Sequence, residues 1–315
     1  MTRFALAVAV TFAACTVAPR PVAVEDATAP DPDDRPLAIR IWRAEDPTKG
    51  ASVPLIVISH GTGGSLAGHR DTARALAAAG FIVVSVNHTG DNYKDQSYVG
   101  RGLHLIGRPR HISRVIDYML TIWTERRHID PGRIGVFGHS AGGFTALVLA
   151  GGDPDMSRGD AHCIAHLQAW DCEYLRQHGF DFANSPPVSP GLWYHDARVK
   201  AAVIAAPAVG YAFEPQGLRQ ITIPIQLWVA GHDPVVDDSP TIVRRLLPRA
   251  PEYHFVGGAG HLSFIAPCDR DEARIAMTAS ANGALDWCAE PDGFDRAKFH
   301  SEFNAAVIAF FNRTL

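Results

Sequence analysis

A serine flanked by glycines, in the sequence GHSAG at residues 138–142, is the first feature that could do chemistry. The strand-like sequence RIGVF precedes it directly, and the apolar, helix-like sequence FTALVLA follows it. A residue held between a strand and a helix in the pattern G-x-S-x-G lies at a sharp, strained turn that presents its side chain to a reactant, and larger flanking residues would collide. The pattern therefore predicts that Ser140 is a nucleophile, in preference to a capping serine in a glycine-rich turn.

A serine hydroxyl is a weak nucleophile unless a base removes its proton and an acid orients that base. Of the fifteen histidines, His261 follows the last predicted strand in the glycine-rich sequence GGAGH. Asp233 follows the strand-like sequence IQLWV within AGHDP. The chain order Ser140, Asp233, His261 is the order expected for an elbow nucleophile, its acid and its base.

Two further carboxylates, Asp237 and Asp238, are the alternatives to Asp233 as the acid. They lie farther from the end of the preceding strand, and we expect them to cap a helix that starts near Pro240. The remaining histidines are expected to be surface groups or hydrogen-bonded structural groups.

Acyl transfer also needs two N–H donors for the oxyanion. The backbone N–H of Ala141, next to the nucleophile, is one candidate. The other is expected in the loop HGTGG at residues 60–64, directly after the strand-like PLIVIS, with Thr62 preferred and Gly61 as the alternative. A phosphate-binding loop is the competing interpretation, but no Gly-Lys-Ser/Thr sequence is present.

The elements that must position these groups alternate regularly along the chain. Short apolar runs, expected to be strands, alternate with helical patterns, one of which is expected to start at Pro109. This alternation predicts an α/β fold with a mostly parallel central sheet and helices on both faces. The chain has 315 residues, of which 47% are hydrophobic and 20% charged, and a net charge of −4; these values exclude a mostly disordered chain and argue against a nucleic-acid-binding face.

The N-terminal residues are expected to lie outside the folded domain. Arg3 precedes an apolar run of about 11 residues, typical of a signal peptide and too short to span a bilayer. The run ends in Ala-Ala before Cys15, so residues 1–15 are interpreted as an export signal. A lipoprotein signal, with Cys15 acylated as a membrane tether, is one form that this signal can take. Residues 16–36 contain five prolines and are interpreted as a solvated tether.

Residues 152–197 interrupt the alternation and are interpreted as an insertion over the carboxyl ends of the strands, within a domain spanning residues 37–315. In an exported protein the four remaining cysteines favour disulfides, and pairing of sequence neighbours predicts Cys163–Cys172 and Cys268–Cys288. A metal site involving His162 is the weaker alternative, since no paired C-x-x-C spacing supports it.

The sequences VISHGTGG, GFIVVSVNHTGDN, RPRHISRVIDYML, RIGVFGHSAGG, AGHDPVV and GAGHLSF resemble the α/β-hydrolases, and more narrowly the group similar to dienelactone hydrolases and platelet-activating-factor acetylhydrolases. The resemblance implies an α/β-hydrolase fold and cofactor-independent hydrolysis of carboxylic esters. True dienelactone hydrolases use cysteine where this chain has Ser140, which argues against dienelactone as the substrate.

These observations predict an exported serine esterase that acts on a small-molecule or lipid ester in the periplasm, at the cell envelope or outside the cell. No metal, organic cofactor or nucleic-acid partner is expected, and the sequence does not indicate the oligomeric state. Two alternatives remain: a phospholipase A2-type acetylhydrolase acting at a lipid surface, and a catalytically silent hydrolase fold used for binding. A peptidase is a weaker alternative among hydrolases.

Overall fold

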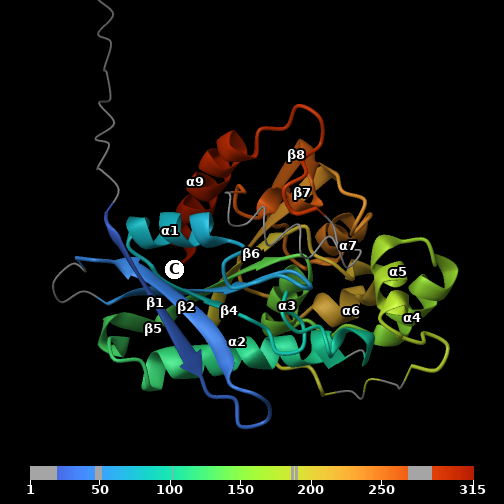
Figure 1. Ribbon diagram of the computed structural model, residues 1–315, viewed down its shortest axis with the longest axis horizontal. Helices are drawn as coiled ribbons and strands as arrows, with labels where there is room; N and C mark the ends of the chain where they lie inside the picture. Colours follow the sequence, from blue (N-terminus) through green and yellow to red (C-terminus); the bar gives the residue numbers. More distant parts are fainter. Residues whose placement is uncertain (1–19, 47–51, 102, 186–187, 189–190, 269–285) are drawn as a thin grey trace, which may run out of the picture.

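One mixed sheet of eight strands forms the centre of the protein (Figure 1). The computed structural model describes residues 20–46, 52–101, 103–185, 188, 191–268 and 286–315. The strands are β1 (Val22–Ala29), β2 (Leu37–Ala44), β3 (Val53–Ser59), β4 (Ile82–Val86), β5 (Ile129–His139), β6 (Val199–Ala205), β7 (Ile225–His232) and β8 (Glu252–Gly260). Their order across the sheet is β1-β2-β4-β3-β5-β6-β7-β8.

The sheet is parallel from β4 to β8, while β2 pairs antiparallel with β4 and β1 pairs antiparallel with β2. The central strands are apolar almost throughout because both faces of the sheet are covered; in β3, residues 55–58 are fully buried. The carboxyl ends of β3, β5, β7 and β8 therefore point to one edge of the sheet, where the predicted functional residues follow them.

Helices cover both faces of the sheet, with α1 and α9 together on one face and α2 and α3 together on the other (Figure 1). This arrangement confirms the predicted α/β class with a mostly parallel sheet. The helices are α1 (Arg70–Ala79), α2 (Leu103–Thr121), α3 (Ala141–Leu149), α4 (Met156–Ala165), α5 (Trp170–Gln177), α6 (Pro215–Leu218), α7 (Ser239–Leu246) and α9 (Arg296–Thr314), with short 3₁₀ turns η1 (Val99–Arg101), η2 (Arg126–His128), η3 (Gly210–Ala212) and η4 (His261–Phe264).

The prediction of a solvated tether over residues 16–36 is wrong for much of its length. Residues Val22–Ala29 form β1, which pairs with all of β2. The five prolines suggested a tether, but all of them lie outside this strand and so interrupt none of its hydrogen bonds. Asp31, which follows the strand, is buried at 4% exposure beside α2.

The predicted signal segment, residues 1–15 with Cys15, lies outside the described residues. Within the described parts of the chain, no helix combines the length and the apolar character that crossing a membrane requires.

The start of α2 also differs from the prediction. The helix begins at Leu103, so that Pro109 lies inside it rather than at its first turn. An internal proline removes one helical hydrogen bond, whereas His104 and Leu105 in the extra turn are buried, which favours that turn. The sequence pattern around a proline does not predict that the residues before it will be buried in the fold.

Candidate active site

Ser140 lies at a strained turn between β5 and α3, with φ 56° and ψ −120°. A Cβ atom added to Gly138 would lie 2.0 Å from the carbonyl oxygen of Gly142, and one added to Gly142 would lie 1.9 Å from the carbonyl oxygen of Ser59. Neither contact is possible, because the opposing atoms belong to the backbone. The two glycines of the G-x-S-x-G pattern are thus required by the close approach of the strand, turn and helix.

Asp233 and His261 are hydrogen-bonded to each other, with His261 Nδ1 2.8 Å from Asp233 Oδ2. Each residue directly follows a strand, Asp233 after β7 and His261 after β8. The second carboxylate oxygen accepts hydrogen bonds from the backbone N–H groups of Val235 (2.9 Å) and Val236 (3.2 Å). Asp233 is therefore held in one orientation, with its acceptor directed at the imidazole.

Burial alone would raise the pKa of Asp233, because it disfavours the charged carboxylate. The charge of His261 and the hydrogen bonds from His261 and the Val235 and Val236 amides outweigh that effect and lower the pKa below its ordinary value. The group therefore stays ionised beside the imidazole at neutral pH.

The alternative acids do not occupy this position. Asp237 and Asp238 are exposed and lie on the turn before α7. Asp238 is at the N-cap position of α7, but its side chain makes no capping hydrogen bond, contrary to our expectation. The hydrogen bond to His261 belongs to Asp233.

The loop at residues 60–64, hereafter the oxyanion loop, lies directly against the nucleophile. A Cβ added to Gly61 would lie 3.1 Å from the Cβ of Ser140. Gly61, Thr62, Ser140 and Ala141 all line one pocket, and Ala141 is the first residue of α3. Thr62 and Ala141 therefore lie at the same pocket as Ser140, and the N-terminus of α3 adds a favourable field for negative charge.

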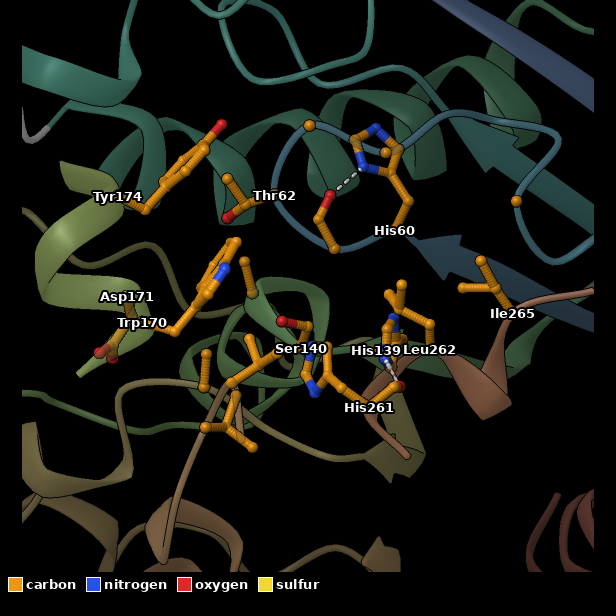
Figure 2. A pocket seen from close by; sticks show the side chains of 18 of the residues that line it. His60, Thr62, His139, Ser140, Trp170, Asp171, Tyr174, His261, Leu262 and Ile265 are labelled. Carbon is orange, nitrogen blue, oxygen red and sulfur yellow. Dashed lines mark hydrogen bonds between the residues drawn. The ribbon is translucent and has the colours of Figure 1, made fainter. Parts of the chain in front are cut away.

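His261 also lines this pocket, beside Ser140 (Figure 2). The imidazole of His261 is hydrogen-bonded to Asp233. Its ring makes no hydrogen bond to the Ser140 hydroxyl in this structure. Catalytic hydrogen bonds often tighten only when substrate binds.

Aromatic side chains that the sequence patterns did not indicate form one wall of the pocket. Trp170 and Tyr174 from α5 stack with ring centroids 4.9 Å apart and an interplanar angle of 11°. They lie on one side of Ser140, and Leu262 and Ile265 lie on the other (Figure 2). The insertion therefore contributes to the pocket, which has an aromatic side and an aliphatic side.

Both predicted disulfides are present: Cys163–Cys172 joins α4 to α5, and Cys268–Cys288 closes a loop after η4. The two sulfurs of the first pair lie close to Asp171, but they are bonded to each other and do not offer thiolates to a metal. His162 instead stacks on Tyr211, with ring centroids 3.8 Å apart. Within the described residues this cluster therefore does not have the chemistry of a metal site.

Four other histidines line the pocket, and all are buried. Burial lowers the pKa of His60 to about 3 and that of His69 to about 4. Burial also lowers the pKa of His104, and it lowers the pKa of His139 well below the ordinary value. His139 Nε2 is 3.0 Å from the backbone oxygen of His261, so this neutral ring supports the loop that carries His261.

These shifts predict a simple acid limb for hydrolytic activity. Asp233 stays ionised, and burial disfavours the charged form of the four other pocket histidines, so a single protonation should account for the loss of activity on the acid side. On the acid side we expect log kcat/KM to fall by one unit for each unit of pH, which corresponds to one proton. The substrate used for this measurement must not itself titrate. A slope of two or more would show that a second pocket group must also be deprotonated.

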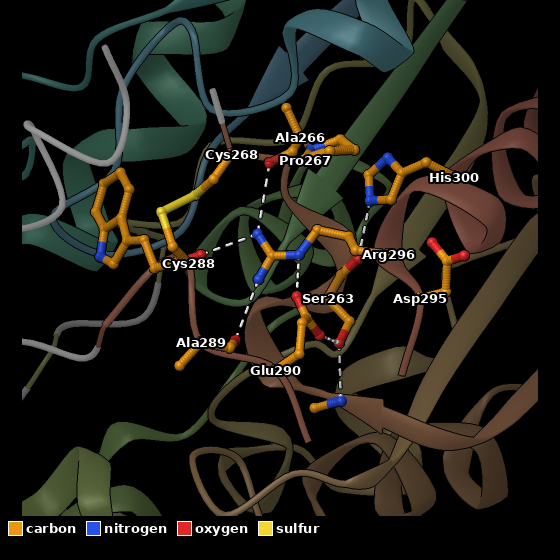
Figure 3. A network of polar contacts seen from close by, with 12 residues as sticks. Ser263, Ala266, Pro267, Cys268, Cys288, Ala289, Glu290, Asp295, Arg296 and His300 are labelled. Carbon is orange, nitrogen blue, oxygen red and sulfur yellow. Dashed lines mark hydrogen bonds and ion pairs between the residues drawn. A yellow bond between two sulfur atoms is a disulfide. The ribbon is translucent and has the colours of Figure 1, made fainter. Parts of the chain in front are cut away.

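A buried arginine, Arg296, lies in a polar network with Ser263, two residues after His261 (Figure 3). Arg296 of α9 pairs with Glu290 and donates to the carbonyl oxygen of Trp287 at 2.9 Å. Glu290 Oε2 accepts from Ser263 Oγ at 2.6 Å, and Ser263 Oγ accepts from the N–H of Gly260 at 2.9 Å. The chain on both sides of His261 is thus tied to Glu290, two residues after Cys288 of the second disulfide.

Loss of the Cys268–Cys288 bridge is expected to lower both stability and turnover. A bridge that closes a 20-residue separation stabilises a protein by about 3 kcal/mol in the chain-entropy model. Trp287, next to Cys288, lines the pocket, so its release should also disturb catalysis. The check is thermal unfolding and ester turnover of the Cys268→Ser/Cys288→Ser protein.

The Cys163→Ser/Cys172→Ser protein is the matched control, because its bridge holds only α4 to α5. We expect that protein to change its preference between short and long esters more than its stability. Equal effects of the two double variants on both properties would contradict the separate roles.

Known proteins resemble this chain in fold. The sequence profile of the prolyl oligopeptidase family matches residues 69–159, which include Ser140. No curated protein sequence matches the chain significantly.

Two solved structures superimpose on most of it. A ferulic acid esterase from Streptomyces cinnamoneus gives a TM-score of 0.63 at 17% identity, covering 96% of this chain and 92% of the esterase. A dienelactone hydrolase from Anabaena variabilis gives a TM-score of 0.51 at 17% identity, covering 83% of this chain and 95% of the hydrolase. Together with the strand order and the serine elbow, these matches establish that the chain has the α/β-hydrolase fold.

Proposed function

We propose that the protein is a serine hydrolase that cleaves carboxylic esters through an acyl-enzyme. The observation that carries the proposal is the placement of the hydrogen-bonded Asp233–His261 pair at the pocket where Ser140 occupies its strained turn. A nucleophile, a base and an oriented acid are the minimum set for this chemistry.

In the first half-reaction, Ser140 Oγ attacks the ester carbonyl carbon and its proton passes to His261 Nε2. Asp233 holds the imidazole in the required tautomer and stabilises the imidazolium. The N–H groups of Ala141 and Thr62 donate to the oxyanion of the tetrahedral intermediate. His261 then returns the proton to the alkoxide oxygen, the bond from carbon to that oxygen breaks, and the alcohol leaves.

In the second half-reaction, water replaces the alcohol. His261 removes a proton from water as its oxygen attacks the acyl carbon, and the same two N–H groups stabilise the second oxyanion. The proton then passes to Ser140 Oγ as the acyl bond breaks, which releases the carboxylic acid and restores the enzyme.

The choice of an ester over an amide rests on leaving-group chemistry and on the solved structures of similar fold. An alcohol leaves with less help from the general acid than an amine does. The two similar structures are described as a ferulic acid esterase and a dienelactone hydrolase. The matched prolyl oligopeptidase profile supports the peptidase alternative.

A matched pair of substrates separates the two activities. The p-nitrophenyl ester and the p-nitroanilide of one acyl group differ only in the bond that breaks. We expect hydrolysis of the ester with little or no hydrolysis of the anilide; a preference for the anilide would favour the peptidase. Hydrolysis of neither compound, across acyl groups from acetate to palmitate, would favour the silent binding protein.

A lipid-surface acetylhydrolase is the second candidate, favoured by two apolar side chains on the insertion. Ile164 is 54% and Leu167 49% exposed, close in sequence to the pocket residue Trp170. Co-sedimentation with anionic and zwitterionic vesicles tests it, with the Ile164→Ser/Leu167→Ser protein as the control. Equal binding by both proteins, or no binding, would contradict a membrane role for these residues.

We also propose that the protein is exported. Its two disulfides support this, since such bonds persist in oxidising compartments. Peptide mapping without reduction, on protein recovered from its native compartment, should find both bridges; four free thiols would contradict export.

A further inference from the structure

A fully buried ion pair lies behind the oxyanion loop. Arg108 Nη1 of α2 is 2.5 Å from Asp91 Oδ2, in the connection after β4, and both side chains are 0% exposed. Burying two charges costs several kcal/mol per ion unless further hydrogen bonds satisfy the remaining donors and acceptors. The partners that satisfy this pair therefore indicate what it holds in place.

Those partners are two backbone groups of the oxyanion loop, one on each side of Thr62. The second oxygen of Asp91 accepts a hydrogen bond from the backbone N–H of Gly63 at 2.8 Å. Arg108 Nη2 donates to the backbone oxygen of His60. Thr62, the candidate oxyanion donor, lies between these two anchored residues, so the direction of its N–H depends on both.

The same guanidinium also contacts the helix that carries the second donor. Arg108 Nε donates to Thr145 Oγ1 at 3.1 Å, and Thr145 Oγ1 donates to the backbone oxygen of Ala141 at 2.7 Å. One planar group with donors in fixed directions thus joins the oxyanion loop to the first turn of α3. The two parts of the proposed oxyanion hole, Thr62 and Ala141, share this support.

We infer that Arg108, with Asp91, is a positioning residue that sets the oxyanion loop against Ser140 and α3 for transition-state stabilisation. This inference rests on the proposed function and adds to it a residue that does not touch the substrate. Donors in an oxyanion hole must be placed before the charge develops, and a displacement of about 1 Å can cost about a hundredfold in rate.

The decisive variant is Arg108→Lys, which keeps the positive charge beside Asp91 but loses the planar fork that reaches the His60 carbonyl and Thr145. We expect kcat to fall about 10- to 100-fold while KM changes less than about threefold, because the loss concerns the transition state and not ground-state binding. The inhibition constant of phenylboronic acid, which forms a tetrahedral anionic adduct with a serine hydroxyl, should rise by a similar factor.

Ser113→Ala is the matched control. Ser113 lies on the same helix, is buried at 1% exposure and donates to the carboxylate of Asp196 at 2.5 Å, on a part of α2 that does not contact the oxyanion loop. We expect this variant to lower the melting temperature and leave kcat within about twofold. A purely structural role for Arg108 would produce the same pattern in Arg108→Lys, with a lower melting temperature and unchanged kcat and boronate affinity, and would overturn the inference.

If Arg108→Lys does not fold, the Thr145→Val variant tests the inference in its place. This substitution removes the acceptor of Arg108 Nε with little change in volume. A fall in kcat of at least about threefold with unchanged KM supports the inference, and an unchanged kcat overturns it. Failure of the proposed function is seen separately, as full activity of the Ser140→Ala protein.

Discussion

Replacement of Ser140 by alanine is expected to lower the turnover of a p-nitrophenyl ester at least about a thousandfold without unfolding the protein. The residual rate would come from substrate binding and the oxyanion hole alone, because no acyl-enzyme can form. Alanine removes a single oxygen atom, so the melting temperature should change little. The measurement is steady-state hydrolysis together with thermal unfolding of the same preparation.

Ser65→Ala is a matched control for this experiment. Ser65 also lines the pocket, where its hydroxyl accepts a hydrogen bond from the N–H of Ala67 at 3.2 Å. We expect this variant to stay within about tenfold of the unmodified protein. Near-normal hydrolysis by Ser140→Ala, or equal losses in the two variants, would contradict the assignment of the nucleophile.

Replacement of Asp233 by asparagine is expected to lower kcat by about a thousandfold to ten-thousandfold. An amide can donate to His261 Nδ1, which favours the tautomer with its proton on the nitrogen that should face Ser140. That nitrogen then cannot act as the base, although the shape of the site is preserved. The measurement is kcat at a pH above the acid limb of the unmodified protein.

Asp237→Asn and Asp238→Asn serve as controls, because both carboxylates are exposed and lie only a few residues farther along the chain. Their kcat should stay close to that of the unmodified protein. A large loss in either control, with Asp233→Asn still active, would move the role of the acid to that residue.

The elbow could be predicted from sequence because its constraints are local. Gly138 and Gly142 are required by backbone atoms within the same strand-turn-helix unit and the adjacent end of β3. The acid and base were predictable for a related reason: each directly follows a predicted strand, and the ends of parallel strands meet at one edge of the sheet. The structure brings Asp233 and His261 into contact across 28 residues of sequence.

Other features of the fold and the site depend on contacts between distant residues, which no local sequence pattern predicts. Arg108 and Asp91 are 17 residues apart, and the sequence places the arginine directly before the helix expected to start at Pro109. The turn of α2 before that proline depends on burial against the pocket rather than on helix propensity. Strand β1 likewise depends on pairing with β2, which outweighs the tether-like composition around it.

The aromatic wall shows the same limit. Trp170 and Tyr174 follow helical spacing on α5, which is compatible with an exposed face, a core face or a binding face. Only the packing of the insertion over the ends of the strands assigns them to the pocket. Their position makes the insertion part of the pocket wall.

The central claim, that Ser140 forms a covalent intermediate with an acyl group, is tested most directly by active-site labelling. The intact protein is treated with a fluorophosphonate, and its mass is measured before and after digestion to map the modified peptide. The account predicts one adduct per chain, on Ser140, no adduct in the Ser140→Ala protein, and loss of ester hydrolysis in proportion to labelling. Adducts on another serine, or unchanged hydrolysis by fully labelled protein, would contradict it.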